Sequence, residues 1–264
     1  EYAEKSFELA RDFNDMSCNF SVIDRHGQGR SSRHLPNPEK QHAREIDHDV
    51  YDIIRYCKDL IPAGESVILL GHSTGALLAT LALKKAPELF RAAILTAPLF
   101  GLANHVIRGK EPLLARLPLP QTLRDLYFPG MGNWLPRTHP DSVLKPEDFS
   151  SDPVRNKVHD FWMTGDRTLR AGAPTVGWAI EICKGIMRTR TPGFAENIKQ
   201  PVLIFTAGQD KLICNKHAFN IASRITNVAL HHYGSAHHEI LMEDDTVRQP
   251  VITHIHDFLK NTLK

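Results

Sequence analysis

Residues 67–79 constrain the fold more than any other stretch, because an apolar, β-branched run leads through Gly-x-Ser-x-Gly into a small-residue, leucine-rich helical pattern. This order predicts a strand, a sharp turn and a helix, with Ser73 on the turn. Such a turn strains the serine backbone and brings its neighbours close, so we expect Gly71 and Gly75 to avoid Cβ clashes. The alternative is an ordinary strand-to-helix turn with a capping serine.

Composition limits the kind of protein this is. The chain has 264 residues, 42% of them hydrophobic and 23% charged, which suits one large globular domain or a domain with an insertion. A net charge of +2 gives no indication of a nucleic-acid partner. Basic residues cluster at Arg108, Lys110, Arg116 and Arg124. This cluster fits either a solvated face or peripheral contact with an anionic membrane surface.

The spacing of the cysteines and the lack of long apolar runs indicate the cellular compartment of the protein. Four widely spaced cysteines lie in apolar contexts without CxxC spacing, namely Cys18, Cys57, Cys183 and Cys214. They predict reduced core thiols in a cytoplasmic protein, peripheral at most to the inner face of a membrane. No apolar run is long enough to span a bilayer, and no signal-peptide pattern is visible.

Histidine pairs raise the question of a metal site. His231-His232 and His237-His238 are adjacent pairs, but neither HExxH nor a Cys/His ligand spacing occurs. We therefore expect neither a metal nor a cofactor.

Hydrophobic periodicity divides the rest of the chain into alternating elements. It predicts strands at 19–24, 66–70, 92–97, 201–208 and 228–233. It predicts helices near 2–13, 39–61, 74–85, 215–224 and 245–263. This alternation indicates an α/β fold, with a mostly parallel sheet and helices on both faces. The glycine-rich residues 24–31 fit no phosphate-binding pattern and are expected to form a tight structural loop.

The alternation breaks between residues 99 and 198. That segment has no clear strand, many prolines and short helical pieces near 120–127 and 153–170. Its aromatic content argues against a disordered linker. We therefore expect a helical cap at 99–198 inserted into a sheet domain made of 1–98 and 199–264.

Three residue types needed for acyl transfer follow three predicted strands. A serine nucleophile needs a base within hydrogen-bond reach and a group that orients the base. Ser73, Asp210 and the pair His237-His238 each follow a strand, and the carboxyl ends of parallel strands meet at one edge. Individually, Asp210 could be a turn residue and the histidines surface polar residues. Together, in this order, they predict a catalytic triad.

These motifs resemble those of a known enzyme family. The elbow at 71–75, the Asp-x-x-Gly-x-Gly-x-Ser loop at 24–31, the acid loop at 207–210 and the histidine segment at 238–243 are similar to α/β-hydrolases of the lysophospholipase and monoacylglycerol-lipase group. The match is closest to the bacterial lysophospholipase type. The resemblance implies an α/β-hydrolase fold with an inserted cap, and a triad of Ser73, Asp210 and a histidine. Counting back from Glu243 favours His238 as the base, and counting forward from Gly234 gives His237.

The resemblance also implies an oxyanion hole. One N–H comes from the residue after the nucleophile, here Thr74, and the other from an early loop that is not in this chain. Family members begin with strands that precede the first helix here, so we expect those N-terminal strands to be missing.

The expected activity is hydrolysis of carboxylic esters of single-chain lipids, either lysophospholipids or monoacylglycerols, through an acyl-enzyme on Ser73. Phe128, Trp162 and Trp178 are candidates to contact the acyl chain, although such aromatics also build cores. The alternatives are a peptidase or acyltransferase on the same triad, or an impaired hydrolase fold that binds a lipid or a partner. The sequence does not indicate an oligomeric state.

Overall fold

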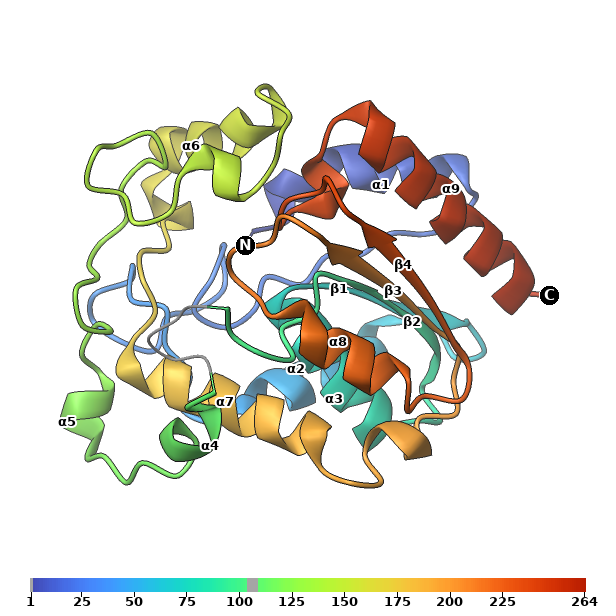
Figure 1. The fold of residues 1–264 in the computed structure, drawn as a ribbon, viewed down its shortest axis with the longest axis horizontal. Coiled ribbons are helices and arrows are strands. Elements are labelled where there is room, and N and C mark those ends of the chain that lie inside the picture. The colour runs from blue at the N-terminus through green and yellow to red at the C-terminus, as the bar shows by residue number, and fades with distance from the viewer. Residues whose placement is uncertain (1, 104–108) are drawn as a thin grey trace.

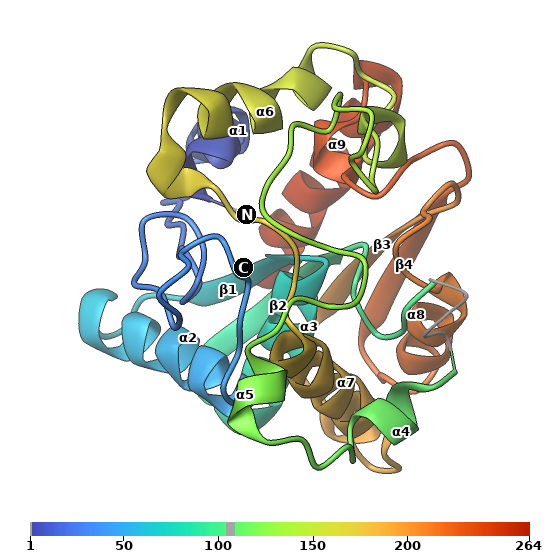
Figure 2. The ribbon, with the colours of Figure 1, turned by 90° about the vertical axis from the view of Figure 1, so that its left-hand side faces the viewer.

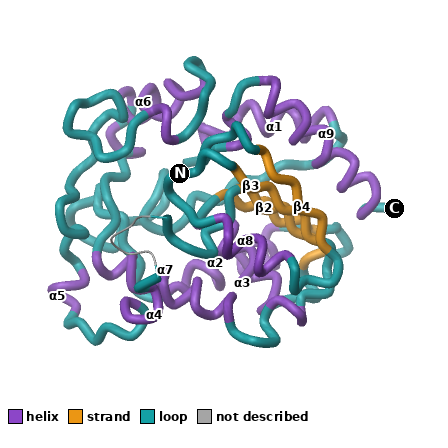
Figure 3. The backbone as a smooth tube through the Cα atoms, in the orientation of Figure 1, coloured by secondary structure: helices purple, strands orange, loops and turns teal. Residues whose placement is uncertain are grey.

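A single parallel sheet forms the centre of the computed structural model, which describes residues 2–103 and 109–264. Within these residues the strand order is β1-β2-β3-β4, and every neighbouring pair is parallel. The strands are β1 (Val67–His72), β2 (Phe90–Thr96), β3 (Val202–Ala207) and β4 (Val228–Tyr233). Figure 3 shows the strands side by side, and because neighbouring strands are parallel their carboxyl ends lie at one edge. The expected α/β class is confirmed.

Nine α-helices are described in these ranges. They are α1 (Phe7–Asp15), α2 (Ile46–Leu60), α3 (Thr74–Lys85), α4 (Glu111–Leu114), α5 (Gln121–Arg124), α6 (Arg155–Gly165), α7 (Val176–Arg190), α8 (Asn215–Ala222) and α9 (Asp245–Thr262). Short 3₁₀ turns lie at η1 (Ala3–Ser6), η2 (Pro146–Asp148), η3 (Arg167–Leu169), η4 (Ala195–Asn197) and η5 (Ile240–Met242).

Helices cover both faces of the sheet. Figures 1 and 2 show α1 and α9 on one face, and α3 and α8 on the other. Helix α3 lies deepest, since every residue from 76 to 83 is buried against β1, β2, α2 and α7. Strand β3 is buried along its whole length, as its continuous apolar sequence requires of a central parallel strand.

The segment between β2 and β3 contains only helices and loops in its described part. Helix α7 packs on α3, and its Ile182 and Ile186 are fully buried in the main core. A Cβ at Gly185 would lie 2.3 Å from Ile46 Cδ1, so α7 and α2 need glycine there to approach this closely. Helix α6 stands on the opposite side of the molecule from α7 (Figure 1) and packs beside η1.

Residues 19–24 do not form the strand that their alternation predicts. They have no regular secondary structure, and Val22 and Ile23 remain more than a third exposed. A strand exists only when a neighbour accepts its ladder hydrogen bonds. In the described chain, β1 pairs with β2 alone, and its other side lines a cavity that residues 19–24 also line. The strand prediction was therefore wrong.

Two helix predictions also need correction. Helix α2 begins at Ile46 rather than at residue 39, because Glu39 and Gln41 use their backbone groups to bind residues 172–175. The apolar residues near 2–13 predict a buried face with Phe7, Leu9 and Phe13, and Lys5 on the opposite, exposed face. Leu9 and Phe13 are buried, whereas Phe7 is 63% exposed and Lys5 is buried instead.

Candidate active site

Ser73 occupies the turn between β1 and α3 in a conformation that side chains rarely adopt. Its φ is 52° and its ψ −116°. A Cβ at Gly71 would lie 2.6 Å from both Ala76 Cα and Gly75 O, so this position requires glycine. Gly75 has open space around it, and the expected clash there was wrong. Positive φ at a non-glycine residue is strained and persists only where the surroundings impose it.

Backbone hydrogen bonds impose this conformation. The Ser73 N–H donates to Thr96 O at 3.0 Å, which ties the turn to the end of β2. The Ser73 carbonyl accepts from the N–H groups of Ala76, Leu77 and Leu99. Thr74 is the first residue of α3, where N–H groups point away from the helix and carry partial positive charge.

Asp210 and His238 form a buried pair beside the sheet edge. The Asp210 Oδ2 lies 2.7 Å from His238 Nδ1. Its Oδ1 accepts from the N–H groups of Leu212 at 2.8 Å and Ile213 at 3.1 Å. Burial opposes ionisation, but the hydrogen bond from His238 and these backbone donors outweigh it and hold the pKa of Asp210 below its ordinary value. The carboxylate is thus ionised and fixes the orientation of the imidazole.

The structure separates the two adjacent histidines by their partners. His237 Nδ1 lies 2.9 Å from Glu243 Oε1, and no contact with Asp210 is seen for it. His238 is the one against Asp210, and its side chain is only 4% exposed. Its ring lies 4.8 Å from that of His72, at the end of β1, and 6.3 Å from that of Phe149.

Ser73, Thr74 and His238 line one cavity of about 1980 Å³. Its walls include apolar side chains from the segment between β2 and β3, among them Met131, Met163 and Trp178. Of the candidate acyl-contacting aromatics, Trp178 lines the cavity, but Phe128 and Trp162 are not among its lining residues. Trp162 packs instead against the small core of Tyr2, Met163 and Leu169.

The sequence did not predict a cluster of buried charges that lies beside His238. Glu239 is 4% exposed, and its Oε1 binds both Lys5 Nζ at 2.5 Å and Arg137 Nη2 at 2.9 Å. The Arg137 guanidinium lies 3.4 Å over the Phe149 ring. Glu239 directly follows the histidine, which is a local signal, but nothing near Lys5 or Arg137 in the sequence points to this contact.

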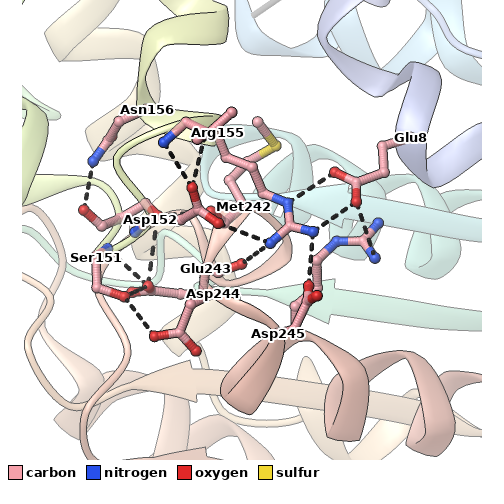
Figure 4. A network of polar contacts seen from close by, with 12 residues as sticks. Glu8, Ser151, Asp152, Arg155, Asn156, Met242, Glu243, Asp244 and Asp245 are labelled. Atoms are coloured by element: carbon pink, nitrogen blue, oxygen red, sulfur yellow. Dashed lines mark hydrogen bonds and ion pairs between the residues drawn. The ribbon is translucent and has the colours of Figure 1, made fainter.

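A second network joins the histidine loop to the segment before α6 (Figure 4). Glu243 is fully buried and accepts from the N–H and Oγ–H of Ser151 at 2.8 and 2.5 Å. On the other side it accepts from the N–H of His237 at 2.5 Å. Arg155 adds ion pairs to Glu8 of α1 and Asp245 of α9. The loop that carries His238 is therefore anchored to two distant parts of the chain.

Other predicted features have simpler outcomes. Arg108 lies outside the described residues; Lys110 and Arg116 are exposed, and Arg124 pairs with Glu181 at 2.8 Å. All four cysteines are free, with Cys57 and Cys183 buried. No group of three metal-ligating side chains occurs in residues 2–103 and 109–264. Over the same ranges, none of the helices has the length and apolar character needed to cross a membrane.

Comparison with known proteins now identifies the family. The family model described as "Serine aminopeptidase, S33" matches residues 1–245. The chain belongs to this family.

Curated relatives carry names of lipid hydrolases. The chain is 27% identical over 255 residues to the probable lysophospholipase L2 of Haemophilus influenzae, which covers 96% of this chain and 78% of that protein. It is 28% identical over 265 residues to lysophospholipase L2 of Escherichia coli strain K12, over 96% of this chain and 76% of that protein. The resemblance to the lysophospholipase group is confirmed.

Solved structures confirm the fold. A soluble variant of monoglyceride lipase from Saccharomyces cerevisiae superposes with a TM-score of 0.74 at 16% identity, covering 99% of this chain and 83% of that one. The monoacylglycerol lipase of Paleococcus ferrophilus gives the same TM-score at 16% identity, over 99% of this chain and 91% of that one. The α/β-hydrolase fold is therefore shown.

Proposed function

We propose that this protein hydrolyses carboxylic esters of single-chain lipids, lysophospholipids or monoacylglycerols, through an acyl-enzyme on Ser73. The observation that carries the proposal is the buried Asp210–His238 pair in the same cavity as a serine on a strained elbow. The named activities of the curated relatives support the choice of lipid esters.

Each residue has a role that its surroundings support. Asp210 stays ionised and holds the Nδ1–H of His238, so Nε2 is free to take the Ser73 proton as the hydroxyl attacks the acyl carbonyl. The N–H of Thr74, at the positive end of α3, stabilises the oxyanion. His238 then returns the proton to the leaving alcohol, and water releases the acid by the same steps in reverse.

The apolar lining of the cavity supports a substrate that carries an acyl chain. The side chains of Met131, Met163 and Trp178 offer an apolar surface, and their burial of alkyl groups contributes about 25 cal/mol per Å². In this proposal residues 99–198 act as the cap that supplies this surface, over a core of 1–98 and 199–264.

The test compares ester with amide turnover. Purified protein is assayed with p-nitrophenyl esters of increasing chain length and with matched p-nitroanilides, beside Ser73→Ala. The proposal expects ester turnover that rises with chain length and is lost in Ser73→Ala. Faster amide than ester turnover would instead establish a peptidase, and efficient transfer to an added alcohol would establish an acyltransferase.

We also propose peripheral contact with a lipid surface through the apolar residues at α1 and α6. Phe7, Val154 and Phe161 are 63%, 71% and 70% exposed, and Trp162 contacts both phenylalanine rings. Exposed aromatics of this kind favour the membrane interface. Co-sedimentation with anionic vesicles should fall for Phe161→Ser and not for the equally exposed but distant Leu60→Ser; equal binding of the two variants would contradict the proposal.

A further inference from the structure

Arg137 is a buried cation on the wall of the active-site cavity with donor capacity to spare. Its side chain is 8% exposed, yet it lines the same cavity as Ser73 and His238. Its Nη2 binds Glu239, but its Nη1 has no hydrogen-bond partner among the described residues. Leaving a buried charged donor unsatisfied costs free energy, so such a group commonly has a ligand.

The charges around Arg137 favour an anion. Lys5 and Arg137 both contact the same carboxylate oxygen, Glu239 Oε1. Burial and the charges of Arg137 and Lys5 hold the pKa of His159 well below its ordinary value, so this ring adds no charge. Asp160 accepts the backbone N–H of Arg137 at 2.8 Å, and burial raises the pKa of its carboxyl. Among the described residues, the guanidinium forms an ion pair with Glu239 alone.

Arg137 and His238 share an aromatic neighbour, Phe149. The guanidinium lies 3.4 Å over the Phe149 ring, whose other contact is the His238 ring at 6.3 Å. The cation is therefore one aromatic ring away from the base. In a 1-acyl glycerophospholipid the phosphate is separated from the ester carbonyl by the glycerol backbone alone. A carbonyl at Ser73 and a phosphate at Arg137 would both lie in the cavity that these two residues line.

We propose that Arg137 binds the phosphate of the lipid headgroup through Nη1, and that this contact selects lysophospholipids over monoacylglycerols. A planar guanidinium suits phosphate oxygens and gives charge-assisted hydrogen bonds. The inference rests on the proposed ester hydrolysis at Ser73, and it chooses between the two lipid classes that the proposed function leaves open.

The experiment compares two substrates that differ in the phosphate. Acylglycerol phosphate and monoacylglycerol with the same short acyl chain are assayed below their micellar concentrations, with wild type, Arg137→Gln and Arg137→Lys. Arg55→Gln is the matched control, because Arg55 is 82% exposed on α2 and pairs only with Asp59. We expect kcat/KM for the phosphate substrate to fall about 10- to 100-fold in Arg137→Gln, the range for loss of a hydrogen bond to a charged group. Monoacylglycerol turnover should stay within about twofold.

The outcomes separate specificity from stability. Equal losses on both substrates would make Arg137 a structural residue and overturn the proposal. If Arg137→Gln fails to fold, Arg137→Lys decides, since its single ammonium nitrogen keeps a cation beside Glu239 but cannot also occupy the position of Nη1. An unchanged substrate ratio in Arg137→Lys together with misfolding of Arg137→Gln would also overturn it. Wild type that hydrolyses neither substrate refutes the proposed function itself.

Inorganic phosphate distinguishes a headgroup site from a site for a free anion. With a headgroup site, phosphate competes with the acylglycerol phosphate and leaves monoacylglycerol turnover unchanged. Stimulation of monoacylglycerol turnover by phosphate, lost in Arg137→Gln, would assign the site to a free anion and contradict headgroup binding.

Discussion

Replacing Glu243 by glutamine tests how strongly the histidine loop is anchored. Both oxygens of the carboxylate accept hydrogen bonds. Oε1 accepts from the N–H of His237 and lies 2.9 Å from its ring Nδ1, and Oε2 accepts from the N–H and Oγ–H of Ser151. Glutamine keeps the shape but replaces one oxygen with an NH₂ group. Whichever side receives that group, one backbone N–H, of His237 or of Ser151, then faces a donor.

The expected cost follows from these contacts. A hydrogen bond to a charged acceptor contributes about 1.5–3 kcal/mol, so the loss of one backbone bond in Glu243→Gln should lower the free energy of unfolding by about 1.5–3 kcal/mol. Domains of this kind are stable by only about 5–15 kcal/mol. Because His238 follows His237 directly, kcat for ester hydrolysis should fall as well.

Urea unfolding of Glu243→Gln and Asp244→Asn measures the effect. Asp244 is the neighbouring acid; it caps α9 by accepting from the N–H of Thr246 at 2.9 Å. Asparagine caps helices about as well as aspartate, so this control should lose less than about 0.5 kcal/mol. If the two variants unfold within about 0.5 kcal/mol of each other, the anchoring role assigned to Glu243 is wrong.

Two further predictions concern the elbow and the acid. Gly71→Ala should lower the free energy of unfolding, measured by thermal melting, by about 1–3 kcal/mol. Gly75→Ala lies in open space on α3 and should be neutral or stabilising by up to about 1 kcal/mol. Equal losses of stability in the two variants would refute the turn geometry. The lowered pKa of Asp210 contributes stability that is present above its unfolded value near 3.9 and lost as pH falls through the lower folded value. The free energy of unfolding, measured from pH 2 to 6, should therefore depend more steeply on pH in wild type than in Asp210→Asn. Identical slopes would contradict the stabilising role of the ionised Asp210.

The sequence predicted those parts of the fold that depend on local pattern. The four strands and α3 follow from continuous apolar runs and from the glycines of the elbow, and the structure has them within a few residues. Asp210 and the histidine pair could be placed at one edge because parallel strands end together.

The remaining features depend on partners that are distant in the chain. Residues 19–24 have a strand's alternation but no neighbour to pair with, and residues 39–45 lie in a helical pattern but bind the segment at 172–175. The choice between His237 and His238 required knowing which ring meets Asp210 and which meets Glu243. The contact between Lys5, Arg137 and Glu239 spans most of the sequence, so no local pattern predicts it.

The most direct test of the account is covalent labelling of the serine. A fluorophosphonate probe reacts with a serine only where a base activates it. The account predicts labelling of wild type at Ser73, none in Ser73→Ala, strong loss in His238→Ala, and retention in His237→Ala. Labelling that survives His238→Ala but is lost in His237→Ala, or that occurs at a serine other than Ser73, would contradict it.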